Sequence, residues 1–299
     1  MTVQTTTDGT LHHDPEAFAQ AIGLTYTVSG TNPCVRRRRC GKGHTYRHTH
    51  EGTIRRGHPM RSWIEELAIP PAWTQVWISP VRESHLLATG YDTADRKQYR
   101  YHERWTEARR RHHDGGLVRF ARRLPTLRAE VERILGARRG ADVRAHAAAA
   151  RMLDLTGVRI GNLDSVAVHG THGLTTLTVD HLEIEGEALH LSFLGKGGAE
   201  REIDLEDPQL AGVLRNAAEH DDAHLFSWRG RDGEGHVTAR SLNHFLKDHL
   251  GTRAHAHQFR SWLCTWRTLE GLRRRDSSNP VRTLIEVLEP IAEHLGHTV

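Results

Sequence analysis

The spacing of apolar residues changes once along the chain, and this change constrains the fold more than any other feature. Before residue 105, short runs that alternate apolar and polar residues are separated by Gly, Pro and Asp, as in LTYTV, TQVWIS, HLLATGYD and QYRYH. Such alternation is typical of strands in an antiparallel sheet. After residue 116, apolar residues recur at three and four positions, as in LVRFARRLPTLRAEVERILG and DVRAHAAAARMLDLTG, which is typical of helices. The sequence therefore predicts an α+β chain, β-rich first and mainly helical afterwards.

This change of pattern predicts three segments. Residues 1–20 are polar and are expected to be flexible. Residues 21–113 are expected to form a small β-rich domain with a short helix at MRSWIEELA, which Pro70 and Pro71 end. Residues 114–299 are expected to form a helical domain. The charges and paired glycines of WTEARRRHHDGG, residues 105–116, predict a hinge between the two domains.

A small sheet is predicted inside the helical domain. LTTLTV, HLEIEG and ALHLSFLG have the composition of three short strands, and KGGAE leads on to the continuation REIDL. The last turn of this sheet carries Lys196 at its tip. Further helices are predicted at residues 208–219, 238–250, 257–273 and 280–295.

Positive charge is concentrated in the first third of the chain. Residues 1–113 contain 17 Lys and Arg against 11 Asp and Glu, whereas residues 114–299 contain 24 against 26. The excess, and above all the run VRRRRCGKGHTYRH, favours contact with a polyanion through phosphate contacts and counterion release. A run of charge is also what a plain solvated surface carries. Charge alone therefore does not define a nucleic-acid-binding protein.

Membrane-spanning, secreted and disulfide-bonded classes are not favoured. The sequence has no run of about 18 apolar residues, and its N-terminus lacks the basic-then-apolar order of a signal peptide. A cytoplasmic protein is expected. The cysteines, Cys34, Cys40 and Cys264, are too few and too scattered for a disulfide framework. A zinc site of Cys34 and Cys40 with the histidines of GHTYRHTH is an alternative, which the loose C-x5-C spacing and the intervening arginines disfavour.

Lysine is rare in this chain. Of 41 Lys and Arg residues only four are lysines: Lys42, Lys97, Lys196 and Lys247. An ammonium group can lose its proton near neutral pH when its surroundings lower its pKa, whereas a guanidinium cannot. Lys196, in the turn LGKGG, is therefore a candidate proton donor.

Four residues of the helical domain have the chemistry needed for phosphoryl transfer. They are Arg159 in LTGVRIGN, Lys196, Arg260 in HAHQFRSWL and His297 in HLGHTV. The arginines can stabilise charge on non-bridging oxygens, and the lysine can protonate a departing oxygen. No acidic cluster that would hold a metal accompanies them in the sequence. Taken singly, each could equally be a surface or salt-bridge residue.

The order of these motifs resembles the type IB DNA topoisomerases of the small bacterial and poxvirus branch. The similarity extends from about Gly23 to Val299 and includes, in the family's order, PCVRRRRCGKGHTYR, LAIPPAWTQVWISP, ATGYDTADRKQYRYHERW, LDLTGVRIGN, GLTTL, FLGKGG and FRSWLCT. By this resemblance Arg159 and Arg260 are the two catalytic arginines, Lys196 is the general acid, and His297 contacts the scissile phosphate.

The resemblance also identifies a DNA-contacting strand. The residues that match positions touching bases and phosphates, or lie among them, are Arg96, Lys97, Gln98, Tyr99 and Tyr101. Tyr99 and Tyr101 are then expected to be rings packed against DNA, worth about 1–3 kcal/mol per base, rather than nucleophiles. Their alternative role is that of cross-strand pairs in a sheet.

The chemistry implied by the resemblance is transesterification without ATP, metal or other cofactor. A tyrosine oxygen attacks a backbone phosphate, a 3′-phosphotyrosine forms and a 5′-hydroxyl is freed, and the hydroxyl attacks back after the duplex has swivelled. The resemblance places this tyrosine shortly after His297, yet no tyrosine follows Tyr101 in residues 1–299. We therefore expect no strand cleavage by these 299 residues, either because the sequence ends early or because the nucleophile is lacking.

The implied partner is duplex DNA, held by a monomer that closes around it as a clamp at the cytoplasmic nucleoid, with no role for a membrane. Two alternatives remain open. One is a DNA-binding protein of this family that lacks the nucleophile. The other is a tyrosine recombinase, which would need a helical N-terminal domain in place of the RKQYRYH sheet. His257 shares the H-x-x-R frame of recombinases with Arg260; it is either a further DNA contact or an ordinary helix-face histidine.

Overall fold

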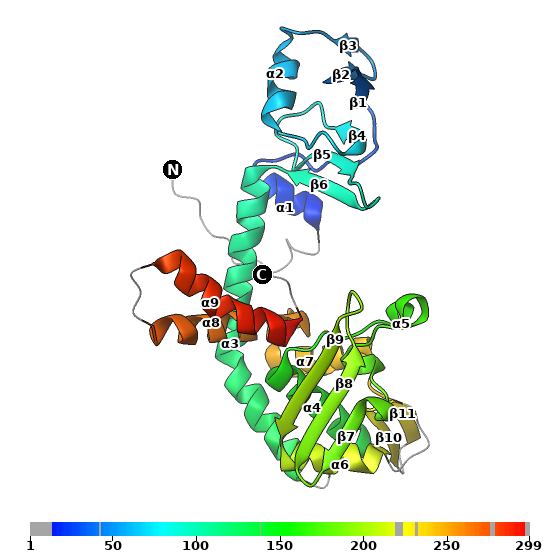
Figure 1. The fold of residues 1–299 in the computed structure, drawn as a ribbon, viewed down its shortest axis with the longest axis vertical. Coiled ribbons are helices and arrows are strands. Elements are labelled where there is room, and N and C mark those ends of the chain that lie inside the picture. Colours follow the sequence, from blue (N-terminus) through cyan, green and yellow to red (C-terminus); the bar gives the residue numbers. More distant parts are fainter. Residues whose placement is uncertain are drawn as a thin grey trace. The chain divides into compact units, whose positions relative to one another are not determined.

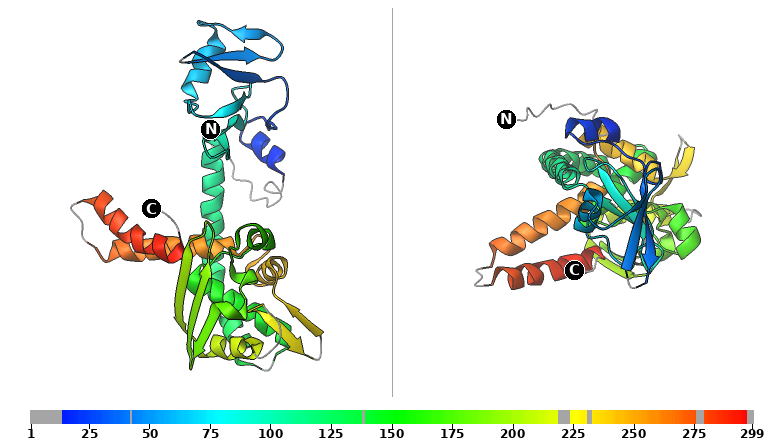
Figure 2. Two further views of the ribbon diagram at one scale, coloured as in Figure 1. Left: turned by 45° about the vertical axis from the view of Figure 1, so that its right-hand side comes forward. Right: turned by 90° about the horizontal axis from the view of Figure 1, so that it is seen from above.

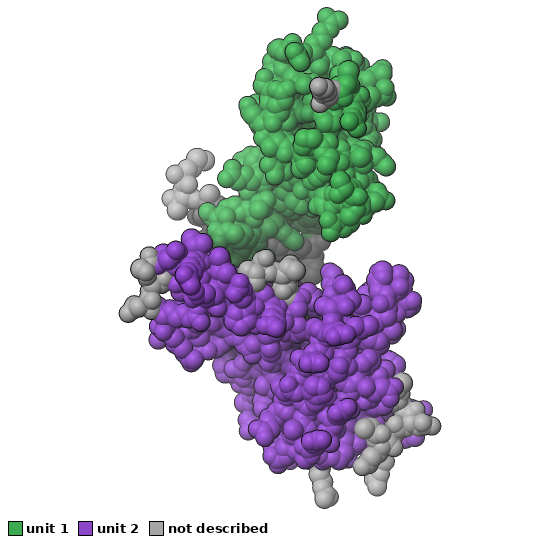
Figure 3. Space-filling model, in the orientation of Figure 1, with its two compact units in different colours: residues 1–114 green, residues 115–299 purple. Residues whose placement is uncertain are grey.

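The computed structural model describes residues 14–41, 43–137, 139–218, 224–230, 233–275 and 279–296. The chain forms two compact units, residues 1–114 (unit 1) and residues 115–299 (unit 2), shown in Figure 3. Each unit has its own hydrophobic core. Unit 1 is dominated by a sheet and unit 2 by helices, so the predicted α+β class is confirmed (Figure 1).

Unit 1 is built on one antiparallel sheet whose six strands have the order β3-β2-β1-β4-β5-β6. The strands are β1 (Val35–Cys40), β2 (Gly43–His48), β3 (Gly52–Ile54), β4 (Thr74–Ile78), β5 (Leu86–Tyr91) and β6 (Lys97–Tyr101). One face of the sheet packs against the predicted helix, α2 (Pro59–Glu66), through Val35, Ile54, Trp63 and Ile64. The arginine run of the sequence is therefore strand β1, which has one buried end and several exposed arginines.

Two details of unit 1 differ from the sequence-based expectation. The stretch LTYTV is not a strand, because only Thr25 forms a bridge, to Ser84. Part of the segment expected to be flexible is a helix, α1 (Pro15–Ala21), whose N-terminus is capped by the Asp14 carboxylate. Phe18 of this helix packs edge-on against Trp105 at 5.1 Å between ring centroids. A contact across so many residues is not visible in local sequence patterns.

The segment of residues 105–116, predicted as a hinge, contains the boundary between the two units, after residue 114, but it has no break in secondary structure. A single helix, α3 (Glu103–Gly136), runs through it without a break. Glu107 forms ion pairs with Arg110 and Arg111 at 3.0 and 2.7 Å, one turn away along the helix. Such pairs, together with the flanking helical sequence, offset the cost of about 1 kcal/mol that each glycine of the pair brings.

Unit 2 surrounds the alanine-rich helix α4 (Ala141–Thr156). Four consecutive alanines of α4, residues 147–150, are completely or almost completely buried, and their small side chains allow close approach of other elements. The remaining helices are α5 (Leu163–His169), α6 (Pro208–Ala218), α7 (Ala239–Leu250), α8 (His257–Arg273) and α9 (Pro280–Leu295). The four helices predicted after residue 207 are confirmed. Helices α8 and α9 lie side by side (Figure 2), and no helix of the described ranges has the length and apolarity to cross a bilayer.

The small sheet of unit 2 has the order β7-β8-β9. Its strands are β7 (Leu182–Glu185), β8 (Ala188–Leu194) and β9 (Glu200–Glu206), and a separate hairpin pairs β10 (Ser227–Gly230) with β11 (Gly233–His236). The stretch LTTLTV, predicted as a strand, forms two 3-10 turns instead. The Thr176 hydroxyl accepts from the Gly173 N–H at 3.0 Å and holds the first turn closed, so a side chain overrides the β propensity of the segment.

Candidate active site

Arg159 lies on the loop that follows α4. The helix ends at Gly157, which is left-handed (φ 60°) and donates its N–H to Leu153 O at 2.9 Å. A Cβ added to Gly157 would lie 2.8 Å from Leu295 and 3.1 Å from Leu263, so glycine allows both the turn and the approach of α8 and α9. The Arg159 guanidinium makes no hydrogen bond or ion pair within the described ranges, and burial lowers its pKa.

Gly173 lies directly against the backbone of the Arg159 loop. An added Cβ would lie 2.6 Å from the Arg159 carbonyl oxygen and 2.6 Å from the backbone of Gly161. Because these are backbone atoms, Gly173→Ala should lower the free energy of unfolding by about 1–3 kcal/mol, as measured by urea denaturation. Gly212→Ala in α6 is the control, since its Cβ would meet nothing within 4 Å and alanine favours a helix by about 0.5–1 kcal/mol. Equal stabilities of the two variants would contradict this account.

Lys196 lies in the turn between β8 and β9, as predicted, and its side chain is exposed. The turn is closed by hydrogen bonds from Gly195 N to Ala199 O at 2.8 Å and from Gly198 N to Gly195 O at 3.1 Å. Gly197 and Gly198 have positive φ angles of 82° and 75°, which residues with a Cβ adopt only with strain. We call residues 195–199 the Lys196 turn.

Arg260 is on the first turns of α8 and is only 5% exposed. One of its amino groups donates to Gly157 O at 2.8 Å, and the other donates to Leu295 O. The guanidinium therefore links α8 to the ends of α4 and α9. Burial, and then the neighbouring Arg159 and Arg201, lower the pKa of Arg260 to about 10.

Arg201, which the sequence analysis did not single out, is the third arginine at this place. It is 9% exposed on β9, and it donates from one amino group to Glu293 O at 2.8 Å and from the other to His294 O. A signal for it exists in the sequence: in REIDL, the alternation that buries Ile203 also buries residue 201. An arginine at an inward position of an alternating strand is rarely a plain surface residue.

Arg159, Arg201 and Arg260, here called the arginine cluster, bring positive charge together at a partly buried place. Burial is the first cause of the lowered pKa of each, and repulsion between the guanidinia is a further cause for Arg201 and Arg260. Guanidinium groups stay protonated nevertheless. Within the described ranges, neither Arg159 nor Arg201 has an ion pair with a carboxylate. An anion placed between these groups would be strongly stabilised.

The predicted residues are thus brought together in part. The structure places Arg159 and Arg260 within electrostatic reach of one another. The Lys196 turn is beside them, because Gly195 packs against the Arg201 side chain so closely that an added Cβ would lie 2.8 Å from its Cγ. His257 is the first residue of α8, exposed, with its ring 6.4 Å from that of His255. His297 lies outside the described residues.

His294, one residue before the end of α9, is held next to these cations. Burial first, and then the charges of Arg267, Arg201 and Arg260, lower its pKa from 6.5 to about 4. Its Nε2 atom is buried and has no hydrogen-bond partner within the described ranges.

This depressed pKa predicts a pH dependence of stability. The unfolded chain binds a proton at His294 more readily than the folded chain does. The neutral His294 side chain therefore makes its full contribution to the free energy of unfolding above pH 6.5, and this contribution is lost as the pH falls from 6.5 toward 4. We expect the free energy of unfolding to decrease over this interval, and His294→Gln to flatten the decrease. Urea denaturation at a series of pH values measures both, and identical slopes for the two proteins would refute the assignment.

In unit 1 the predicted DNA-contacting residues lie on or next to β6. The rings of Tyr99 and Tyr101 are nearly parallel, with centroids 5.9 Å apart and exposed fractions of 47% and 42%. The Lys97 Nζ atom lies 5.7 Å from the Tyr99 centroid, so a cation and two rings share one face of the strand. The remaining two side chains both donate to the Asp92 carboxylate: Arg96 at 3.0 Å and Gln98 at 2.8 Å.

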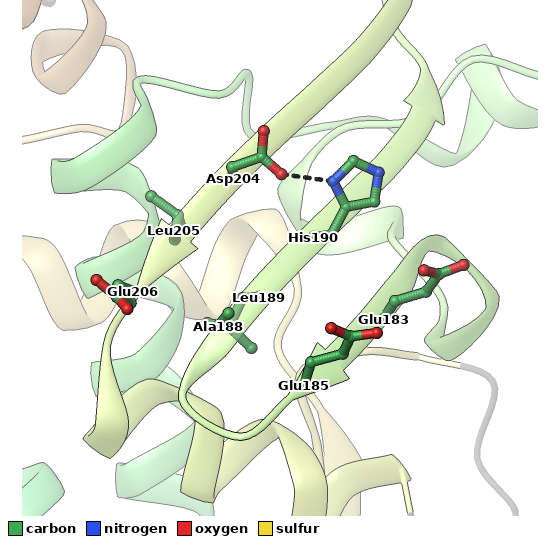
Figure 4. Close-up of a pocket in the computed structure, with 8 residues that line it drawn as sticks. All are labelled: Glu183, Glu185, Ala188, Leu189, His190, Asp204, Leu205 and Glu206. Carbon is green, nitrogen blue, oxygen red and sulfur yellow. Dashed lines mark hydrogen bonds and ion pairs between the residues drawn. The ribbon is translucent and has the colours of Figure 1, made fainter.

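A separate hollow on unit 2 has the opposite charge. It lies on the sheet β7-β8-β9 and is lined by Glu183, Glu185, Asp204 and Glu206, with His190 hydrogen-bonded to Asp204 at 2.6 Å (Figure 4). The Asp204 carboxylate raises the pKa of His190. Four carboxylates repel a phosphodiester, so this hollow is not the place where DNA chemistry is expected.

The zinc alternative gains no support. The Cys34 thiol is buried and donates to Asn32 Oδ1 at 3.3 Å, whereas Cys40 is exposed at the other end of β1. In the part of the chain that the structure describes, no three His, Cys, Asp or Glu side chains are grouped so as to hold a metal ion.

Comparisons with known proteins agree with these two units. The family model "Bacterial DNA topoisomerase IB, N-terminal domain" matches residues 43–92, and "Eukaryotic DNA topoisomerase I, catalytic core" matches residues 115–298. The DNA topoisomerase 1B of Acanthamoeba polyphaga mimivirus is 24% identical over 247 residues, which are 79% of this chain and 74% of that protein.

Among solved structures, the XerH site-specific recombinase bound to difH substrate, in a pre-cleavage complex, is 18% identical with a TM-score of 0.38. The match covers 58% of this chain and 46% of the recombinase chain, and a post-cleavage complex of XerH matches similarly over 44% of its chain. A TM-score of this size is too low to define a shared fold. The catalytic-core match, in contrast, extends over more than half of the sequence, and the chain belongs to the type IB DNA topoisomerases, isomerases that act on duplex DNA.

Proposed function

We propose that unit 2 cleaves and rejoins one strand of duplex DNA at the arginine cluster and the Lys196 turn, and so relaxes supercoils. A tyrosine phenol loses its proton as its oxygen forms a bond to phosphorus, the bond from phosphorus to the 5′ oxygen breaks, and that oxygen takes up a proton as it leaves. In the reverse step the 5′-hydroxyl loses its proton and attacks phosphorus, and the tyrosine oxygen takes up a proton as it leaves. The phosphodiester bond energy is kept in the phosphotyrosine, so the cycle needs no ATP.

Each residue has a definite task in this proposal. Arg159 and Arg260 hold the non-bridging oxygens as negative charge grows on them, and Lys196 donates the proton to the 5′ oxygen. His297 contacts the same phosphate, a role proposed from the sequence alone. The observation that supports the assignment best is the gathering of Arg159, Arg201 and Arg260 beside the Lys196 turn, although the three arginines come from the loop after α4, from β9 and from α8.

Unit 1 supplies further contacts to the duplex in this proposal. Tyr99 and Tyr101 present exposed rings and Lys97 a cation on one face of β6, and His257 adds a contact from unit 2. We infer that a monomer suffices, that both units grip the same duplex as a clamp, and that the protein works at the nucleoid where its substrate is.

Binding of duplex DNA should weaken steeply with salt. Counterion release gives a slope of about −0.9 in log K against log salt for each phosphate contacted, so six or more contacts cost about a thousandfold or more between about 50 and 200 mM salt. Lys97→Ala should make the slope shallower by about one contact, whereas Lys247→Ala, an exposed lysine of α7 outside the proposed site, should leave it unchanged. Fluorescence anisotropy over a salt series measures these slopes, and a salt-independent affinity would contradict the proposed grip.

Plasmid relaxation without metal or ATP tests the function itself. All five tyrosines of the sequence lie at or before residue 101, so the assay compares residues 1–299 with a form that continues through a tyrosine-bearing helix. We expect relaxation and a covalent protein–DNA adduct from the longer form, and loss of both when its tyrosine is replaced by phenylalanine. DNA binding without an adduct from either form would favour the alternative, a DNA-binding protein that lacks the nucleophile.

A further inference from the structure

Arg201 connects two parts of the site that are far apart in the sequence. It is the second residue of β9, directly after the Lys196 turn, and its two amino groups donate to the carbonyl oxygens of Glu293 and His294, the former at 2.8 Å. These carbonyls belong to the last turn of α9, which leads to residue 297. The side chain thus bridges the Lys196 turn and the end of α9.

The fit around Arg201 is close on both sides. An added Cβ on Gly195, in the Lys196 turn, would lie 2.8 Å from Arg201 Cγ, and one on Gly296, after α9, would lie 2.7 Å from its Nη1 atom. Gly296 is also left-handed (φ 61°). The Arg201 side chain therefore lies close to the backbones of both Gly195 and Gly296.

The chemistry of this contact requires a guanidinium. The last carbonyls of a helix lack partners within the helix and carry its partial negative charge, so a cation is favourable there. A planar fork with two amino groups can satisfy two successive carbonyls, whereas a lysine ammonium is a single point charge. The Glu293 carbonyl already accepts from the Gly296 N–H at 2.9 Å, so Arg201 adds a second bond to the helix end at the point where the chain leaves α9.

We propose that Arg201 is a positioning residue, which holds the end of α9 in register with the Lys196 turn so that groups following α9 meet the same phosphate as Lys196. This inference rests on the proposed strand-transfer function, because it concerns the geometry of that reaction. In this proposal Arg201 acts on the end of α9, to whose carbonyls both of its amino groups donate, and not on the DNA. Its loss should therefore change the rate of transesterification far more than the affinity for DNA.

The variants are Arg201→Met, which removes the charge and the fork, and Arg201→Lys, which keeps only the charge. The matched control is Arg123→Met. Arg123 also donates to a carbonyl at the end of a helix, Leu250 O of α7 at 3.0 Å, but among the described residues it has no hydrogen bond or ion pair with the Lys196 turn. If Arg201 only supplies a hydrogen bond to the end of a helix, Arg201→Met and Arg123→Met should thus change the rate of adduct formation equally.

Two readouts separate the possible roles. The first is the single-turnover rate of adduct formation in the tyrosine-bearing form, with DNA affinity measured in parallel. A misplacement of about 1 Å can cost about a hundredfold in rate, so we expect about that loss for Arg201→Met, a smaller loss for Arg201→Lys, and DNA affinities within about threefold of the unchanged protein. Arg123→Met should keep the rate of adduct formation.

The second readout is hydrogen exchange of the amides at residues 293–296, which should speed up by about tenfold or more in Arg201→Met while those of α4 stay protected.

Faster exchange at the end of α9 with an unchanged rate of adduct formation would overturn the proposal, since Arg201 would then be only a helix cap. Equal rate losses in Arg201→Met and Arg123→Met would overturn it as well. Should Arg201→Met fail to fold, Arg201→Lys carries the same comparison. Absence of an adduct from the unchanged tyrosine-bearing protein would refute the proposed function instead, and the exchange measurement would then decide separately whether Arg201 holds α9.

Discussion

Lys196→Ala in the tyrosine-bearing protein should slow strand cleavage by about 10²–10⁴-fold, the usual contribution of a general acid, while the affinity for duplex DNA changes by less than about threefold. The side chain is exposed at the tip of the β8–β9 turn, so its removal disturbs no packing. Lys196→Arg should not restore the rate, because a guanidinium does not give up its proton near neutral pH. Single-turnover cleavage and equilibrium binding measure the two quantities.

A substrate with a better leaving group makes this test specific. If the 5′ oxygen is replaced by sulfur, the leaving thiolate (pKa about 8.5) needs no proton donor, and the defect of Lys196→Ala should largely disappear. Lys247→Ala is the matched lysine control and should cleave both substrates normally. A defect of equal size on both substrates, or comparable losses in binding and rate, would argue against a proton-donor role for Lys196.

Arg159→Ala and Arg260→Ala should each lower the cleavage rate by about 10²–10³-fold, equivalent to about 3–4 kcal/mol of transition-state stabilisation, but they should differ in stability. The Arg159 guanidinium has no hydrogen bond or ion pair within the described ranges, so its removal should change the free energy of unfolding by no more than about 0.5 kcal/mol. Arg260 is buried and donates to Gly157 O and Leu295 O. Its removal should cost about 2 kcal/mol or more, because two carbonyls lose a charged donor.

Thermal or urea unfolding measures the stability of the two variants, and single-turnover kinetics measures their cleavage rates. The double variant should lose less than the product of the single losses, since both arginines act on one phosphate. Full additivity of the rate losses would indicate that the two guanidinia serve different phosphates. A stability loss for Arg159→Ala as large as that for Arg260→Ala would mean that Arg159 is a structural residue.

The local sequence pattern was sufficient to predict those elements whose structure depends only on their own residues. The helices after residue 207 and the Lys196 turn were predictable because their spacing and glycines act within a few residues. It failed in three segments. LTYTV alternates like a strand yet lies outside the sheet, and LTTLTV is rich in β-forming residues yet is held in 3-10 turns by the Thr176 hydroxyl. The paired glycines near residue 115 suggested a hinge, but the surrounding helix tolerates them.

The sequence by itself determined the α+β class, the family and the identity of the candidate phosphate-binding residues, because motifs such as LTGVRIGN, LGKGG and FRSWL carry their chemistry in the residues themselves. Only the tertiary structure decided that Arg159 and Arg260 lie together, that Arg201 joins them, and that the end of α9 is held by two guanidinia. The physical reason is that a pKa, a buried charge or a bridging hydrogen bond depends on which distant backbones meet. In this chain they meet where Gly157, Gly195 and Gly296 leave room.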